Sequence, residues 1–302
     1  MIHDISHESE EMRITNTFNL PETIVRFSQN SHYDSGKSNI TCTQLIDSPR
    51  IVQLRKKHQK ELVQDISEML WMIMGTAMHG ILESVKVEGT ITEERLFTQL
   101  HGWDISGAID SQIVEPDGII IGDYKFTSVW AVMNDKPDWE YQLNIYAWLV
   151  EVVKKTPVKA LRIYAMCRDW QRRDVGKEGY PEVPLVSVEV PLWPLAQRQA
   201  YVEARLKAHA DADTDATLNA DLPKCSPDDQ WRRKETFAVM RNKNMSRAWR
   251  VFDSHEVAVK FAAENKDVTV ITRPAEPIRC KNNFCRVSQF CSQYKDENDE
   301  IH

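Results

Sequence analysis

Apolar residues in this chain recur with two different periods, which predicts a protein built from both helices and strands. A spacing of three and four residues, typical of amphipathic helices, occurs at 41–60 (interrupted near residue 48), 65–85, 137–155 and 194–212. Alternation of apolar and polar residues, typical of half-buried strands, occurs at 95–100 and 103–114, three consecutive isoleucines indicate a buried strand at 118–126, and 158–167 and 184–192 are further strand candidates. Because the two kinds of element interleave, we expect an α/β fold in which helices flank a central mixed sheet.

The pattern changes after residue 221, and the sequence predicts four parts. Residues 1–38 form a mostly polar N-terminal segment, and residues 39–221 contain the core domain. Residues 222–294 predict a small α+β insertion in the order strand, strand, helix, strand, bounded by cysteines and followed by a cysteine-rich segment. The acidic last stretch, 295–302, is expected to be disordered.

Composition places the chain among globular proteins. Of its 302 residues, 42% are apolar and 27% are charged. No run of about 18 apolar residues occurs, so we expect no transmembrane helix and no membrane partner. The acidic N-terminus is unlike a secretory signal, which predicts a protein of the bacterial or phage-infected host cytoplasm. In that reducing compartment, six cysteines favour metal binding over disulfides.

Charge is distributed unevenly along the chain. The net charge of −7 argues against a nucleic-acid partner, but residues 222–291 contain 14 lysines and arginines against 8 acidic residues. A locally basic face can bind phosphates although the total charge is negative, and the alternative is a solvated surface. We expect a DNA strand to follow the basic and aromatic side chains of this segment, namely Arg232, Arg233, Arg247, Arg250, Trp231 and Trp249.

An acidic hairpin follows the first predicted strands. If residues 115–118 form a four-residue turn, Asp110 falls opposite Asp123 on the neighbouring strand. Two carboxylates so close repel each other unless a cation lies between them. Lys125 shares the face of Asp123 because strands have a period of two, and the carbonyl of Tyr124 can also reach the site. These residues predict a Mg²⁺ or Mn²⁺ site, although an edge strand with exposed charges is the alternative.

Two predicted helices carry further polar pairs at a spacing of one turn. His79 and Glu83 share one helix face. We expect His79 to be a metal ligand and Glu83 to be a further ligand or the group that orients His79. The alternative is that His79 is a core histidine. Gln142 and Tyr146 share a face of a later helix, where they can contact a substrate strand. The alternative for this pair is the polar edge of an amphipathic helix.

The order of these motifs resembles the RecB-like branch of the PD-(D/E)XK nuclease superfamily over roughly residues 40–190, including its CRISPR-associated exonucleases. The resemblance implies a restriction-endonuclease-like core that cleaves DNA, as single strands or duplex ends, with Mg²⁺ or Mn²⁺. The metal ligands would be His79, Asp110, Asp123 and the carbonyl of Tyr124. The catalytic lysine would be Lys125, and Gln142 and Tyr146 would be the hallmark pair of the branch. The acid before the lysine is Asp instead of the more common Glu.

Three cysteines cluster near the C-terminus, at Cys280, Cys285 and Cys291, and Cys225 precedes them by 54 intervening residues. Four thiolates can hold a [4Fe–4S] cluster or a structural Zn²⁺, and the alternative is a set of reduced thiols. The two other cysteines, Cys42 and Cys167, lie in apolar contexts and are expected to be free.

Some RecB-like nucleases have a similar C-terminal cysteine trio that binds an iron–sulfur cluster, with a fourth cysteine near the N-terminus just before a proline. This chain has Ser48 at that place, and four residues instead of two separate Cys280 from Cys285. We therefore expect Cys225 to be the fourth ligand, with Cys42 as the other candidate.

These features favour a metal-dependent deoxyribonuclease, most simply an exonuclease of DNA recombination, repair or replication, with a helicase or recombination protein as a partner. The alternative is a non-catalytic DNA-binding or assembly subunit built on a nuclease fold, because a fold does not determine a function. A third hypothesis is a structural zinc protein without a role on DNA.

Overall fold

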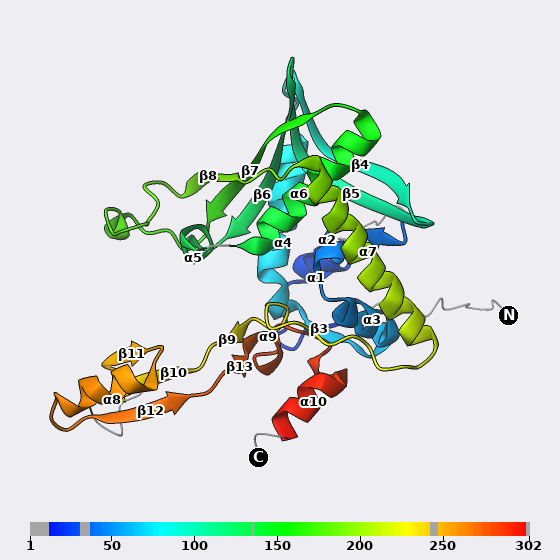
Figure 1. The fold of residues 1–302 in the computed structure, drawn as a ribbon. Coiled ribbons are helices and arrows are strands. Elements are labelled where there is room, and N and C mark those ends of the chain that lie inside the picture. The colour runs from blue at the N-terminus through cyan, green and yellow to red at the C-terminus, as the bar shows by residue number, and fades with distance from the viewer. Residues whose placement is uncertain (1–11, 31–36, 135, 242–246, 300–302) are drawn as a thin grey trace. The chain divides into compact units, whose positions relative to one another are not determined.

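The computed structural model describes residues 12–30, 37–134, 136–241 and 247–299. The chain divides into two compact units, Met1–Pro49 with Gln59–Ala220 and Arg50–His58 with Asp221–His302. We call the first the sheet unit and the second the cysteine unit, and we describe each by itself (Figure 1).

A six-stranded mixed sheet forms the centre of the sheet unit, in the order β2-β5-β6-β7-β8, with β4 paired to β5. Its strands are β2 Ile40–Thr41, β4 Thr90–Leu100, β5 Trp103–Glu115, β6 Gly118–Thr127, β7 Val158–Cys167 and β8 Leu185–Val190. The pairs β4–β5, β5–β6 and β7–β8 are antiparallel, whereas β2–β5 and β6–β7 are parallel. The sheet is therefore mixed, as the sequence pattern predicts.

Helix α6 forms the main packing partner of this sheet (Figure 1). It begins at a proline, which suits the first helical turn, and it supplies the parallel connection from β6 to β7. Fully buried side chains of α6, such as Leu143 and Trp148, pack with Ile121 and Ile163 of the sheet. The helices of the unit are α1 Glu22–Asn30, α2 Cys42–Ile46, α4 Leu70–Glu83, α5 Val129–Met133, α6 Pro137–Lys154 and α7 Leu195–Thr217. No helix in the described part of the chain is both long and apolar enough to cross a membrane.

The β5–β6 hairpin has the predicted register with a shorter loop. Val114 pairs with Ile119, as expected, but Glu115 also pairs with Gly118, so the turn consists of two residues instead of four. Gly118 permits this closure because its φ of 149° is open to glycine and rarely to other residues. Since the register is unchanged, Asp110 and Asp123 still lie one step beyond the last described pair of the ladder.

The N-terminal segment, predicted to be mostly polar, contains regular structure. Strand β1, Arg13–Thr15, pairs in parallel with β3, Val63–Asp65, and α1 follows it. Asp65 fixes this strand, because its Oδ2 accepts hydrogen bonds from Oγ1 of Thr15 at 2.9 Å and from the backbone of Thr17 at 2.8 Å. The remaining parts of that prediction, residues 1–11 and 31–36, lie outside the described residues.

The cysteine unit contains a small three-stranded antiparallel sheet, β11-β10-β12, packed against α8. Phe237, Val239 and Ala258 form its buried core. These elements follow one another as strand, strand, helix and strand between Cys225 and Cys280. The elements of this unit are α3 Pro49–Lys57, β9 Arg232–Arg233, β10 Thr236–Met240, β11 Arg250–Phe252, α8 His255–Ala263, β12 Thr269–Arg273, β13 Glu276–Pro277, α9 Ile278–Lys281 and α10 Ser292–Asp299.

The last residues differ from the predicted disordered tail at 295–302. Helix α10 continues to Asp299, and residues 300–302 lie outside the described part. Glu297 anchors the helix, because its carboxylate accepts hydrogen bonds from the side chains of Gln230 and Arg232. These long-range partners order a segment whose composition alone suggests disorder.

Candidate functional site

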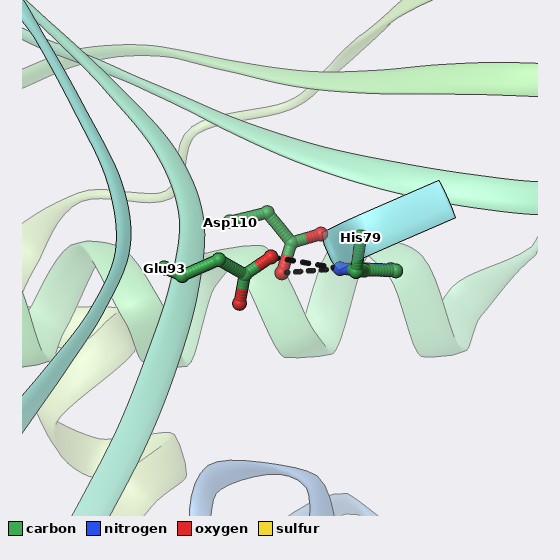
Figure 2. A group of neighbouring side chains, drawn as sticks. All are labelled: His79, Glu93 and Asp110. Carbon is green, nitrogen blue, oxygen red and sulfur yellow. Dashed lines mark hydrogen bonds and ion pairs between the residues drawn. The ribbon is translucent and has the colours of Figure 1, made fainter. Parts of the chain in front are cut away.

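Three metal-ligating side chains converge at one point in the sheet unit. Nδ1 of His79, from α4, lies 2.9 Å from Oε1 of Glu93 in β4 and 3.7 Å from Oδ1 of Asp110 in β5. One ligand atom from each residue lies within 4.8 Å of the other two, and both carboxylates are turned towards the ring nitrogen (Figure 2). An imidazole nitrogen and carboxylate oxygens at this spacing can share one divalent cation.

Glu93 reaches this group because a tight turn fixes the register of the β4–β5 hairpin. The turn is His101–Gly102, where both residues have a positive φ, and the spacing of the pairs is constant along the ladder. This register places Glu93 opposite Asp110, although the two residues themselves do not pair. Glu93 has a φ of 50°, a left-handed conformation that few non-glycine residues adopt. Residues held in such sparsely populated conformations cluster at functional sites.

The helical spacing predicts Glu83 as the acidic partner of His79, but the structure places Glu93 there. Glu83 is the last residue of α4, is exposed, and lies outside the group. The sequence does contain a signal for Glu93. The dipeptide His101-Gly102 suits a two-residue turn between strands, and counting outwards from it places residue 93 opposite residue 110.

The alternation of β5 changes phase close to Asp110. A Cβ atom on Gly107 would lie 3.0 Å from the ring of Tyr146 in α6, so this position faces α6. Gln112 also faces α6, because its Oε1 accepts a hydrogen bond from Nζ of Lys154 at 2.9 Å. These two positions are five residues apart, which a regular strand would place on opposite faces. The alternation of side chains between the two faces of β5 is therefore interrupted between Gly107 and Gln112. Asp110, which is unpaired with β4 and with β6, lies in this interval.

A hydrogen-bonded network lies beside the group. Nε2 of Gln142 donates to Oδ1 of Asp123 and to the hydroxyl of Tyr146, at 3.0 Å in both cases. Oε1 of the same amide accepts from Nζ of Lys125 at 3.0 Å. Asp123 is almost fully buried, and its Oδ2 lies 2.7 Å from Nζ of Lys125 without accepting a well-aligned hydrogen bond from any described residue. A buried carboxylate oxygen without an aligned hydrogen bond is suited to bind a metal cation.

The charges of the two parts of the site interact. Burial, followed by the negative charge of Asp123, raises the pKa of Asp110 to about 7. The pKa of His79 is also raised, first by its hydrogen bond to Glu93 and then by the charge of Asp110. The backbone N–H of Tyr124 donates to Oδ2 of Asp110 at 2.8 Å and links the strands that carry the two aspartates. A divalent cation would relieve the crowding of acidic groups at this point.

The side chains at this site fit a hard divalent cation. His79, Glu93 and Asp110 supply one nitrogen and carboxylate oxygens, and Oδ2 of Asp123 is a buried oxygen that is in an ion pair with Lys125. Of the ligands expected from the sequence, the structure brings His79 and Asp110 together and places Asp123 close enough to perturb the pKa values of both. Glu93 is the ligand candidate that the sequence pattern misses.

The four cysteines that the sequence singles out line one cavity in the cysteine unit. The cavity is bordered by Cys225, Cys280, Cys285 and Cys291, together with residues of α3 and α10. Burial, followed by the nearby sulfurs of the other three cysteines, raises the pKa of the Cys280 thiol to about 12. Thiols in such a group do not ionise readily without a metal, but as thiolates they are suitable metal ligands.

Local backbone contacts hold these cysteines in place. Gln293 of α10 fixes Cys225, since its amide accepts from the backbone N–H at 2.8 Å and donates to the carbonyl at 3.2 Å. The backbone N–H of Cys285 donates to the carbonyl of Arg279 at 2.8 Å. Cys42, the other candidate ligand, is fully buried in the core of the sheet unit.

Four thiolates gathered at one cavity suit either of two groups. One is a single tetrahedral Zn²⁺ with Zn–S bonds of about 2.3 Å. The other is a [4Fe–4S] cluster, in which each thiolate binds a different iron. The chemistry of the cavity therefore fits both groups that the sequence predicts.

The basic residues expected to follow DNA are only partly available. The guanidinium of Arg232 is paired with Glu297, and that of Arg250 lies over the rings of Phe252 and Phe261. Arg233 and Arg247 are exposed, as are the rings of Trp231 and Trp249.

Comparisons with known proteins give two distant structural likenesses. No family model matches the chain, and no curated protein matches it. A crystal structure of SSO0001 is 18% identical, with a TM-score of 0.44 over 70% of this chain and 89% of that one. A crystal structure of a "Putative exonuclease" from Eubacterium rectale is 12% identical, with a TM-score of 0.31 over 54% of this chain and 56% of that one. At these levels of similarity, neither structure assigns a function to this chain.

Proposed function

We propose that the chain is a Mg²⁺- or Mn²⁺-dependent DNA nuclease that hydrolyses phosphodiester bonds. The observation that carries this proposal is the convergence of His79, Glu93 and Asp110 beside the pair formed by Asp123 and Lys125. Metal-dependent phosphodiester hydrolysis uses a cation site next to a cationic side chain, and these residues would form both. The resemblance of the motif order to the RecB-like nucleases supports the same assignment.

In this proposal the metal would be held by His79, Asp110, Asp123 and the carbonyl of Tyr124, with Glu93 as a further ligand or as the group that orients His79. When bound, the cation would lower the pKa of a water molecule and polarise the phosphate. The protein's own part is positional. Because Glu93 contacts Nδ1, it fixes which way the imidazole of His79 is turned.

Lys125 would stabilise the negative charge that develops on the phosphate. Its Nζ is half-buried and is held between Oε1 of Gln142 and Oδ2 of Asp123. A cation that is fixed before the substrate arrives stabilises a transition state more effectively than a mobile one. Tyr146 supports the arrangement, because its hydroxyl accepts from the same amide that holds Asp123.

The DNA strand would lie along aromatic side chains that follow Lys125. Trp71, at the start of α4, is 53% exposed, and its ring centroid is 6.2 Å from that of Phe126. The guanidinium of Arg168 lies 4.7 Å from the ring of Trp71. An exposed aromatic ring beside a cation can stack on a base while the cation approaches a phosphate. This platform favours an unpaired strand as the substrate.

The test compares the wild type with Lys125→Ala on labelled single- and double-stranded DNA in the presence of Mn²⁺. We expect a loss of about 10²–10³ in kcat, as for removal of one transition-state donor. The matched control is Lys159→Ala, since Lys159 of β7 also pairs with acidic side chains, but with Glu115 and Asp117 at the turn of the β5–β6 hairpin. Equal degradation by the wild type and Lys125→Ala would overturn the assigned site.

A second candidate function is a non-catalytic DNA-binding or assembly subunit. Helix α4 favours it, because several of its apolar side chains are exposed, including Met72, Met74 and Ile81. Contiguous exposed apolar residues often mark a protein interface, and a helicase or recombination protein is the expected partner. Binding of DNA without any degradation by the wild type would favour this role.

We further propose that Cys225, Cys280, Cys285 and Cys291 hold a [4Fe–4S] cluster, with Zn²⁺ as the alternative. The cluster would join three segments of the cysteine unit, and the meeting of all four cysteines at one cavity supports it. Anaerobic purification followed by iron, sulfide and zinc analysis tests the proposal. We expect Cys225→Ser to lose iron and Cys42→Ser to keep it, and the opposite result would make Cys42 the fourth ligand.

A further inference from the structure

A buried arginine contacts the cysteine cavity from the N-terminal part of the cysteine unit. Arg50, in α3, is only 4% exposed. Its Nε donates to Sγ of Cys291 at 3.2 Å, its Nη1 to the carbonyl of Leu222 at 2.7 Å, and its Nη2 to the hydroxyl of Ser292 at 2.6 Å. The guanidinium therefore spans three positions of the C-terminal segment.

The charge of Arg50 has no carboxylate partner among the described residues. A guanidinium stays protonated in proteins, and an unpaired buried charge is costly. Two of its three partners, a carbonyl and a hydroxyl, are neutral groups. The third, Sγ of Cys291, is the one atom in this set that can carry a compensating negative charge, as a metal-bound thiolate. Arg198, which among the described residues is buried to a comparable degree, is paired with Glu151.

We infer that Arg50 is the cationic partner of the Cys291 thiolate and sets the reduction potential of the cluster proposed at this cavity. This inference rests on the proposed cluster and deepens it. A hydrogen bond and a positive charge at a ligand sulfur stabilise the reduced, more negative state of an iron–sulfur cluster. Arg50 thus positions Cys291 and raises the potential, and it has no direct part in phosphodiester cleavage.

The experiment is a redox titration of the anaerobically purified full-length protein with dithionite, followed by visible absorbance and electron paramagnetic resonance. We expect Arg50→Met to have at least a tenfold lower ratio of reduced to oxidised cluster at a fixed potential, a shift of about 59 mV for a one-electron couple. Arg50→Lys keeps the charge without the planar fork and should lie between the wild type and Arg50→Met. The matched control is Arg55→Met, an exposed arginine of the same helix that should leave the potential unchanged.

Metal analysis of the same samples separates the two proposals. If the wild type contains zinc or no metal, the proposed cluster fails and the role of Arg50 fails with it. If Arg50→Met contains iron and has the wild-type potential, the cluster stands and the inference about Arg50 is overturned. If Arg50→Met loses its iron, Arg50→Lys decides, because a lowered potential in that variant supports the inference and an unchanged potential or a loss of iron refutes it.

Discussion

Replacing Glu93 by glutamine removes one negative charge from the metal group while keeping the size of the side chain. Oε1 of Glu93 lies 2.9 Å from Nδ1 of His79, so the substitution weakens the contact that orients the imidazole and removes a candidate ligand. Loss of a group that orients a metal ligand typically lowers metal affinity 10- to 100-fold. We therefore expect Glu93→Gln to bind Mn²⁺ at least 10-fold more weakly than the wild type.

This loss has a measurable effect on stability. At a free Mn²⁺ concentration of about 100 times the wild-type Kd, binding stabilises the folded wild type by about 2.7 kcal/mol. At the same concentration, a 10-fold weaker site gives about 1.4 kcal/mol and a 100-fold weaker site about 0.4 kcal/mol. The assay is calorimetric titration with Mn²⁺, with denaturant unfolding at fixed Mn²⁺ as the second measurement.

The matched control is Glu83→Gln, which changes the acid that lies one helical turn from His79. Glu83 is exposed and outside the metal group, so its substitution should leave the Mn²⁺ affinity within about twofold of the wild type. If Glu83→Gln weakens binding and Glu93→Gln does not, the helical pairing is correct and the site geometry described above is refuted.

Four further predictions concern the same unit. The pKa of Asp110 is raised to about 7 and that of His79 is raised above its usual value, so Mn²⁺ must displace protons from this group in the metal-free protein below about pH 7. Mn²⁺ affinity should therefore rise as pH rises through 7, and calorimetry in buffers of different ionisation enthalpy should detect more proton release at pH 6 than at pH 8. In the metal-free protein, the raised pKa of Asp110 means that its protonated form stabilises the fold. This contribution to the free energy of unfolding is full below pH 4 and is lost as pH rises through 7. Denaturant unfolding across this pH range measures the loss. Gln142→Leu leaves Oδ1 of Asp123 without its donor and should lower the free energy of unfolding by about 1–3 kcal/mol, whereas no change would show that water replaces the amide. Trp71→Ala should weaken binding of single-stranded DNA, measured without divalent metal, by about 1–3 kcal/mol and should leave duplex binding unchanged, and an equal loss for both would refute base stacking.

The sequence predicts the hairpin of the site well because its geometry is local. Strand period and turn chemistry are properties of neighbouring residues, so the register that places Asp110 opposite Asp123 can be counted from the chain. The loop is two residues shorter than predicted, yet the register is unchanged because shortening is symmetric about the turn. The same counting from His101-Gly102 identifies Glu93, whose importance becomes clear only when both hairpins are considered together.

Long-range contacts limit what the pattern alone can predict. The convergence of Cys225 with the C-terminal trio can be proposed from spacing and cysteine chemistry, but the shape of the cavity depends on how the segments pack. Arg50 gives no signal in the sequence, because it lies 241 residues from Cys291 and its neighbours look like an ordinary basic helix. Its role becomes apparent only from its burial and its missing carboxylate.

The position of Glu93 also bears on whether this site serves the fold or a function. A non-glycine residue in the left-handed region costs roughly 1–3 kcal/mol, and the neighbouring acids Asp110 and Asp123 add repulsion at the same place. The sheet requires neither the unusual conformation of Glu93 nor the repulsion between the acids, because the β4–β5 ladder keeps the same register on both sides of Glu93. Packing therefore gives no reason for an acidic side chain in a strained conformation opposite a buried aspartate. A divalent cation gives one reason for both features, because it would bind the carboxylates that repel each other and use the side-chain direction that the unusual φ provides.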